Sequence, residues 1–172
     1  LTELASYLES IAPAQIAESW DNVGVLVRCA QEVTGVLCAL DITPATVREA
    51  RAVGCNAIVS HHPVIFRPLK ELRQDDVPAL LVREGVSAVC MHTNLDKAQG
   101  GVNDVLAQAL GLRDTEPFAG GIGRVGALPE TMEAAAFAQF VGKALAVPVK
   151  WADAHGPVPV SYTHLRAHET EL

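Results

Sequence analysis

Short apolar runs rich in β-branched residues alternate with amphipathic segments along much of the chain. Residues 55–60 and 86–91 are two such runs, and each has the length and composition of a buried strand. Residues 33–40 have the same character, and residues 20–27 have the pattern of a turn that leads into a strand. This alternation predicts an α/β fold in which successive strands pair in parallel through right-handed crossovers.

The segments between the strands carry helical spacing of apolar residues and recognisable end signals. Thr43 and Pro44 have the pattern of an N-cap and a first helical residue, and Gly54 that of the residue after a helix end. Thr131 is expected to cap the last helix, and residues 147–151 are expected to form one more strand. The predicted helices span residues 2–11, 44–53, 75–84, 101–110 and 131–146.

Histidines and an aspartate directly follow two of the predicted strands. His61 and His62 come after the run that ends at residue 60, and His92 and Asp96 come after the next run. Ligands of open α/β sheets bind beyond the carboxyl ends of the strands, so these side chains could converge on one crevice. Imidazole and carboxylate groups bind zinc, iron and manganese. Two neighbouring histidines could serve two ions with Asp96 as a bridge, as in two-metal hydrolases.

The same residues allow other interpretations. The His-His-Pro turn could be a solvated loop, and Asp96 could cap the turn before the glycines at 100 and 101. Adjacent histidines on an extended strand point to opposite faces, so they can share a crevice only where the backbone turns. The glycine-rich segment 121–126 lacks the spacing of a dinucleotide-binding fingerprint, which favours a tight turn between two strands.

Composition narrows the classes of function. Hydrophobic residues make up 49% of the chain and charged residues 19%, as in globular proteins. The net charge of -7 argues against nucleic acid or an anionic membrane as the main partner. No apolar run reaches the length of a membrane span and no signal-peptide pattern opens the chain, so a cytoplasmic location is expected. Cys29, Cys38, Cys55 and Cys90 form no CxxC pair and are expected to be reduced, mostly buried thiols.

Several motifs occur in a characteristic order along residues 1 to 150. They are WDNVG at 20–24, ALDIT at 39–43, HHPVIFRPLKEL at 61–72, HTNLD at 92–96, GGVND at 100–104 and GIGRVG at 121–126. Together they resemble the signature of the NIF-three-like family, whose bacterial members are commonly labelled GTP cyclohydrolase 1 type 2. The resemblance implies a NIF-three-like domain over residues 1–159, with a largely parallel or mixed sheet flanked by helices and a second lobe that is missing or incomplete.

The resemblance also implies a dinuclear metal centre. It assigns His61 and His62 as ligands, one to each of two divalent ions (zinc, iron or manganese), and Asp96 as the bridging carboxylate. His92 would orient a ligand or a metal-bound water from nearby. It further implies a homo-oligomer, often a ring built from dimers, and a metal-dependent hydrolase acting on a small molecule such as a nucleotide. The alternative is a metal-binding scaffold or metal-handling protein without turnover, which acts through contacts with partners.

The sequence departs from the family pattern near its end. The family completes its site with a late histidine and glutamate in a Gly-His-Tyr-x-x-x-Glu pattern, which has no match here. His164 and His168 have the spacing of a zinc motif, but residues 160–170 resemble one reading frame of a sequencing adapter. We therefore interpret residues 160–172 as a non-native tail, which is expected to pack little against the core and to supply no ligand.

Overall fold

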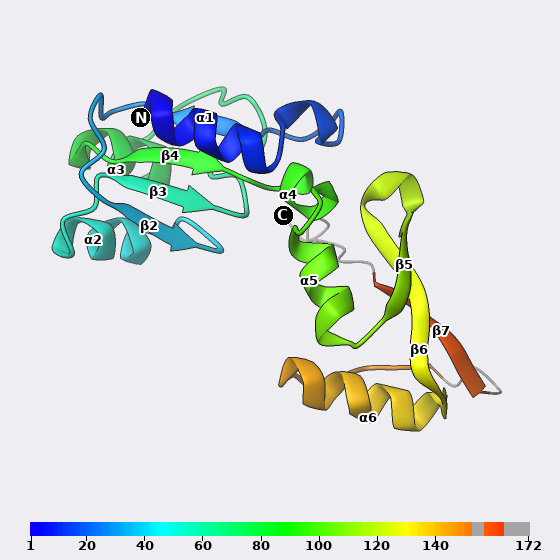
Figure 1. Cartoon of the computed structure of the whole chain (residues 1–172). Helices are drawn as coiled ribbons and strands as arrows, with labels where there is room; N and C mark the ends of the chain where they lie inside the picture. The colour runs from blue at the N-terminus through cyan, green and yellow to red at the C-terminus, as the bar shows by residue number, and fades with distance from the viewer. Residues whose placement is uncertain (153–156, 164–172) are drawn as a thin grey trace. The chain divides into compact units, whose positions relative to one another are not determined.

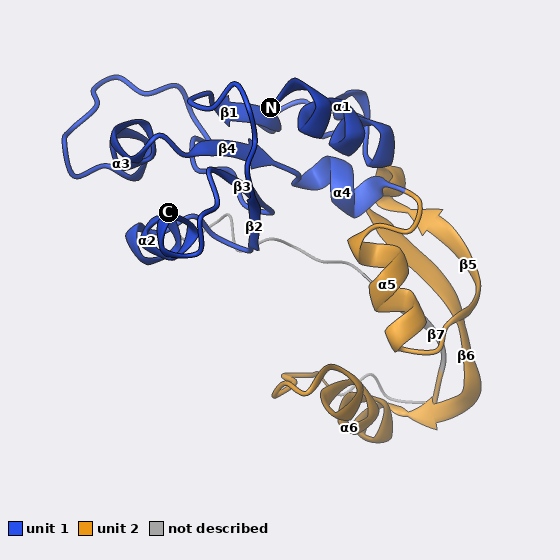
Figure 2. Ribbon diagram, turned by 60° about the vertical axis from the view of Figure 1, so that its left-hand side comes forward, with its two compact units in different colours: residues 1–98 blue, residues 99–172 orange. Residues whose placement is uncertain are grey.

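The computed structural model describes residues 1–152 and 157–163, which form two compact units (Figure 2). Unit 1 comprises residues 1–98, and unit 2 comprises the described residues from 99 onward. All of the predicted site residues lie in unit 1.

Unit 1 is built on a mixed four-stranded sheet (Figure 1). The strand order is β1 (Gly24–Val27), β4 (Ser87–Cys90), β3 (Ala57–Ser60) and β2 (Val36–Ala39). β2, β3 and β4 are parallel, while β1 runs antiparallel to β4 at the edge. The prediction of an α/β fold with a parallel or mixed sheet is confirmed.

Helices cover both faces of this sheet. α1 (Thr2–Ile11) lies on one face, and α2 (Pro44–Ala52) and α3 (Val77–Glu84) lie on the other (Figures 1 and 2). The short α4 (Thr93–Lys97) directly follows β4, and a single 3-10 turn, η1 (Ala14–Ile16), follows α1. The α2 and α3 helices are the crossovers that make β2, β3 and β4 parallel and bring their carboxyl ends to one edge.

α2 begins where the sequence predicts. Thr43 is its N-cap and forms a reciprocal capping box with Thr46, and Pro44 is the first helical residue. Gly54 follows the helix with φ of 79°, a left-handed conformation that glycine adopts without steric strain. These end signals fix the length of α2 and deliver the chain into β3.

Two hydrophobic clusters hold unit 1 together. The smaller one lies beside α1. Its buried members are Ala12, Met91 and Ala98, which pack against the partly buried Leu8, Val59 and Leu95. The larger one fills the space between the sheet and the α2–α3 layer. Its buried members are Val27, Ile42, Val47, Ala50, Ile58, Leu80, Leu81, Val86 and Ala88.

The four cysteines are free thiols, but the expectation of general burial is wrong. Cys90 is buried, and burial raises the pKa of its thiol. Cys38 is exposed because β2 is an edge strand of which alternate residues are exposed. Cys29 and Cys55 are only partly buried.

Unit 2 combines an antiparallel sheet with two helices. Its strands pair in the order β5, β6, β7, and both pairings are antiparallel. The elements are α5 (Val102–Ala109), β5 (Arg113–Phe118), the 3-10 turn η2 (Ala119–Gly121), β6 (Gly123–Glu133), α6 (Ala134–Leu145) and β7 (Pro157–Thr163).

Several sequence predictions for unit 2 are wrong. β5 was not predicted, because all six of its residues are exposed and give no apolar alternation. Thr131 lies inside β6, and α6 starts only at Ala134, so Thr131 is not an N-cap. Residues 147–151 form no strand. The long pairing of β6 with its neighbours overrides the local helix signal at Thr131.

The tail prediction fails in part. Residues 160–163 belong to β7 and pair with β6, with Val160 opposite Ala127 and Tyr162 opposite Val125. β6 offers an open edge, and an extended β-prone segment satisfies its backbone groups whatever the origin of that segment. His164 and His168 lie outside the described residues, and the non-native origin of residues 160–172 stays a prediction.

A charged network ties the glycine-rich turn of unit 2 to α5. Arg124 is buried and donates to the carboxylate of Asp104 and to the carbonyl oxygens of Gly121 (2.8 Å) and Gly123 (3.0 Å). Asp104 also accepts from the backbone N–H of Gly100 at 2.6 Å. Burial raises the pKa of Asp104, but the hydrogen bonds from Arg124 and Gly100 and the positive charge of Arg124 lower it below its usual value.

This lowered pKa predicts an acid-sensitive contribution to stability. Above the ordinary aspartate pKa of about 3.9 the contribution of Asp104 is fully present, and it disappears as the pH falls through the lowered folded-state value. Asp104→Asn should therefore reduce the free energy of unfolding at pH 7 and have a smaller effect at pH 3. Urea unfolding at both pH values measures the difference, with the exposed Glu130→Gln as control. An Asp104→Asn effect that is equal at the two pH values would contradict the assignment.

Candidate metal centre

The four residues predicted from the sequence lie together at one edge of the unit 1 sheet. The ring centroid of His61 lies 5.2 Å from that of His62 and 5.2 Å from that of His92, and His62 and His92 are 5.9 Å apart. Each ring offers one ligand atom, and these three atoms lie within 4.8 Å of one another. The Nε2 atom of His61 is 3.7 Å from the Oδ1 atom of Asp96.

Strand register explains this convergence. Ser60 at the end of β3 pairs with Cys90 at the end of β4, so the next residues of both strands lie side by side. Beyond β3 the backbone turns, and the hydroxyl of Ser60 donates to the carbonyl oxygen of His62 at 2.9 Å. Because of this turn, the rings of His61 and His62 approach one another instead of pointing to opposite faces of the sheet.

The Nδ1 atom of each ring is hydrogen-bonded to an oxygen that only accepts. With an acceptor there, Nδ1 carries the proton and the lone pair of Nε2 is the one that can bind a cation. This arrangement is typical of histidines that ligate metals. The three pairs are His61 with the carbonyl of Met91 (3.0 Å), His62 with the carboxylate of Asp41 (2.8 Å) and His92 with the carboxylate of Asp21 (2.8 Å).

Burial differs strongly among the four residues. His92 and Asp96 are buried, while His61 and His62 are partly open to solvent. Burial lowers the pKa of His61, and the neighbouring rings of His92 and His62 lower it further against the opposing hydrogen bond with Met91. The neutral imidazole is thereby favoured, and this is the form that binds metal.

The carboxylate of Asp21 is ionised in the folded protein. Burial raises its pKa, but hydrogen bonds from His92 and Thr93 outweigh this and hold the pKa at about 2. Both the backbone N–H of Thr93 (3.0 Å) and its hydroxyl donate to Oδ2 of Asp21. The hydroxyl oxygen of Thr93 in turn accepts from the backbone N–H of Glu18 at 2.9 Å.

Sequence reasoning missed Asp21 and Asp41 as members of the site. Both occur in motifs singled out above, WDNVG and ALDIT, and the position of Asp41 just after a predicted strand was an available signal. Two further residues of the WDNVG motif, Trp20 and Asn22, also make contacts near the site. Asn22 donates to the carbonyl of Ile65 at 2.6 Å, whereas the ring of Trp20 also lies edge-on to that of His92, with centroids 6.5 Å apart.

The alternative role for Asp96 as a cap is not tested by these contacts and stays a prediction. The backbone N–H of Gly100 donates to Asp104. Asp96 lies in α4 with its side chain almost completely buried and one oxygen directed at His61. A buried carboxylate among imidazoles indicates a binding role more than a turn role.

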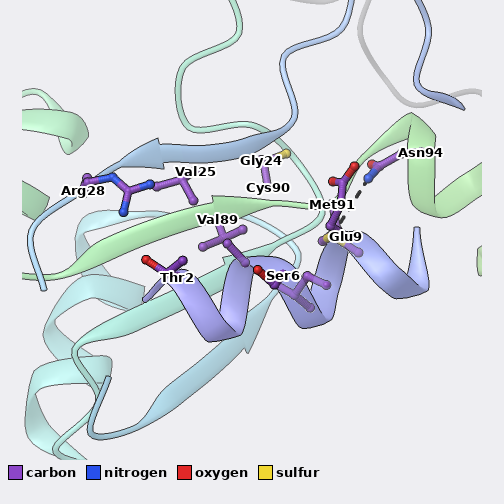
Figure 3. Close-up of a pocket in the computed structure, with 12 residues that line it drawn as sticks. Thr2, Ser6, Glu9, Gly24, Val25, Arg28, Val89, Cys90, Met91 and Asn94 are labelled. Carbon is purple, nitrogen blue, oxygen red and sulfur yellow. Dashed lines mark hydrogen bonds between the residues drawn. The ribbon is translucent and has the colours of Figure 1, made fainter. Parts of the chain in front are cut away.

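Unit 1 contains two hollows of similar size. One, of about 330 Å³, lies beside His62 and is lined by Asp41 and by apolar side chains including Val64 and Leu69. The other, of about 320 Å³, lies between α1 and strands β1 and β4, with Val89 on the strand side (Figure 3). Only the first includes a residue of the histidine cluster, which makes it the better candidate for a substrate.

Comparison with known proteins places the chain in a family. The model of the family described as Duf34/NIF3 (NGG1p interacting factor 3) matches residues 1–159. The chain belongs to this family. The resemblance inferred from the motifs is thereby confirmed.

Relatives of the chain carry the name GTP cyclohydrolase 1 type 2 homolog. One from Staphylococcus aureus (strain MRSA252) is 42% identical over 118 residues, which cover 66% of this chain and 32% of the relative. One from Lactococcus lactis is 42% identical over 125 residues, which cover 69% of this chain and 49% of the relative. The matched part therefore spans about a third to a half of the length of these relatives.

Solved structures share the fold. The crystal structure of a hypothetical protein from Staphylococcus aureus matches with a TM-score of 0.76 and 30% identity, covering 86% of this chain and 65% of that one. The Bacillus cereus protein related to NIF3 matches with a TM-score of 0.82 and 22% identity, covering 94% of this chain and 74% of that one.

In the described part of the chain, no helix is long and apolar enough to cross a membrane.

The residues of the site fit a divalent cation. Three imidazoles with acceptor-bound Nδ1 atoms, beside a buried carboxylate, form a nitrogen and oxygen donor set that suits zinc, iron or manganese. The cluster that the structure brings together is His61, His62 and His92, and the division of roles among these residues and Asp96 stays a prediction.

Proposed function

We propose that this protein is a metal-binding member of the Duf34/NIF3 family and that it acts as a metal-dependent hydrolase with two divalent ions. The observation that carries the proposal is the cluster of His61, His62 and His92, whose ligand atoms lie within 4.8 Å of one another next to the carboxylate of Asp96. Groups of this kind, at the carboxyl ends of parallel strands, are typical of metal centres in α/β proteins.

The side chains would divide the work of binding. His61 and His62 would each hold one ion, and Asp96 would bridge the two, because a carboxylate has two oxygens and so can contact both. Bound divalent ions would supply Lewis acidity to the substrate and lower the pKa of water toward neutrality. The backbone turn after β3 and the buried α4 would keep these donors in place without reorganisation.

The hollow beside His62 would hold the substrate. Its walls combine apolar residues such as Ile42 and Val64 with the carboxylate of Asp41, so it suits a flat heterocycle that carries N–H donors. The names of the relatives point to the nucleotide class, which agrees with this lining. A homo-oligomeric ring built from dimers is proposed from the family resemblance alone.

Hydrolysis by the purified protein is the test of this function. In the presence of zinc or manganese we expect turnover of a nucleoside triphosphate, and we expect loss of turnover on chelation and in His61→Ala. Glu3→Ala, at an exposed position remote in sequence from the cluster, serves as the control. Tight metal binding without turnover of any nucleotide tested would support the non-catalytic scaffold instead, and absence of metal binding would reject both.

A further inference from the structure

We propose that Asp21 is a positioning residue that fixes His92 in the tautomer with its proton on Nδ1 and so makes His92 a third imidazole donor of the metal centre. This inference rests on the proposed function in that it concerns the same centre. It differs from the role expected for His92 from the family resemblance, which placed it outside the ligand set.

The carboxylate of Asp21 uses both of its oxygens in fixed contacts. Oδ1 accepts from Nδ1 of His92 at 2.8 Å, and Oδ2 accepts from the backbone N–H of Thr93 at 3.0 Å and from the Thr93 hydroxyl. The side chains of Asp21 and His92 are 0% and 1% exposed. Water therefore cannot replace either partner, and two donors on Oδ2 prevent the carboxylate from rotating.

The position of the His92 ring makes its tautomer consequential. His92 lies within ring-contact distance of both His61 and His62, and its ligand atom belongs to the same cluster. A proton on Nδ1 leaves the lone pair on Nε2 for a cation, whereas a proton on Nε2 would abolish this donor. The tautomer of His92 therefore decides whether the cluster offers two or three imidazole donors to a cation.

A second pair in the same site provides an internal comparison. Asp41 contacts Nδ1 of His62 at the same 2.8 Å, but these side chains are 56% and 34% exposed. Water can replace Asp41 there, since the imidazole is open to solvent. The two pairs therefore differ in burial while sharing chemistry and distance.

The substitution Asp21→Asn should invert the tautomer of His92. The two donors of Thr93 require an oxygen, so the amide oxygen of the new side chain must face Thr93. The amide NH₂ then faces Nδ1 of His92 and obliges this nitrogen to accept, which moves the ring proton to Nε2. The same substitution has this effect in histidine–aspartate pairs of catalytic triads.

Nitrogen-15 NMR of the metal-free full chain reads the tautomer directly. We expect the proton of His92 on Nδ1 in the wild type and in Asp41→Asn, and on Nε2 in Asp21→Asn. Thr93→Val is the control for damage to the network, because its backbone N–H still reaches Asp21; it should keep the wild-type tautomer. A wild-type His92 with its proton on Nε2 would overturn the proposal even if no variant folded.

Zinc affinity, measured by competition with a chelator, is the second measurement. Loss of such an orienting contact weakens metal binding by about 10- to 100-fold, and we expect this for Asp21→Asn and a smaller loss for Asp41→Asn. An Asp21→Asn affinity equal to or above that of Asp41→Asn would overturn the proposal. If the wild type binds no zinc, the proposed function fails, whereas the tautomer experiment still tests the role of Asp21.

Discussion

In the proposed two-ion centre, replacing Asp96 by Ala is expected to release both ions. A bridging carboxylate serves two ions at once, and Asp96 is buried with one oxygen 3.7 Å from Nε2 of His61. Its loss also leaves the two cations without a negative charge between them. Elemental analysis of the purified, dialysed variant should find less than one ion per chain.

The variant His62→Ala provides the matched control for Asp96→Ala. His62→Ala removes one donor from the more exposed side of the cluster, so it should mainly weaken one of the two ions. Two tightly held ions in Asp96→Ala would contradict the bridging role. Equal losses in Asp96→Ala and His62→Ala would indicate that the two residues serve a single ion.

Leu81→Ala is expected to lower the free energy of unfolding by about 2–5 kcal/mol, the range for leucine truncations in a packed core. Leu81 lies on the inner side of α3 and is completely buried in the cluster between the sheet and the helices. Urea unfolding measures the change. This cluster supports β3 and β4, which position the histidines. In Leu81→Ala the arrangement of the metal centre should therefore be lost only when the fold itself unfolds.

Val82→Ala on the same helix is the control for this prediction. Val82 is 61% exposed, and substitutions at such positions usually change stability by no more than about 0.5 kcal/mol. A loss at Leu81 no larger than that at Val82 would show that the packing between α3 and the sheet contributes little.

Local signals made most of unit 1 predictable from the sequence. Thr43, Pro44 and Gly54 carry the geometry of a helix start and end within a few residues, and the structure places α2 there. The short apolar runs before His61 and His92 are buried, as is typical of parallel strands. This pattern made it predictable that the two strands run in the same direction and that both histidines lie at the same edge of the sheet.

Unit 2 was harder to predict from the sequence because its strands are defined by pairing between residues that are distant in the sequence. β5 has no buried residue, so it can be recognised as a strand only by its backbone pairing with β6. Thr131 looks like an N-cap when considered alone, but β6 extends to Glu133 through its pairing with β7. Sequence-local reasoning has no access to such long-range backbone bonds.

In the site, the convergence of the histidines and Asp96 was predictable, whereas the contact between Asp21 and His92 was not. His61, His62, His92 and Asp96 follow strand ends, so topology alone brings them together. Asp21 reaches His92 across 71 positions of sequence, and its role depends on burial and on two further hydrogen bonds. Contacts of this kind can be identified only from the folded structure.

Anomalous diffraction at the zinc edge, from crystals of the protein grown with zinc, tests the central claim most directly. The account predicts two anomalous peaks, one about 2.0–2.1 Å from an imidazole nitrogen of His61 and one about as far from an imidazole nitrogen of His62, each with a carboxylate oxygen of Asp96 at a similar distance. A crystal in which these three side chains are ordered and the peaks lie elsewhere, or are absent at saturating zinc, would contradict it.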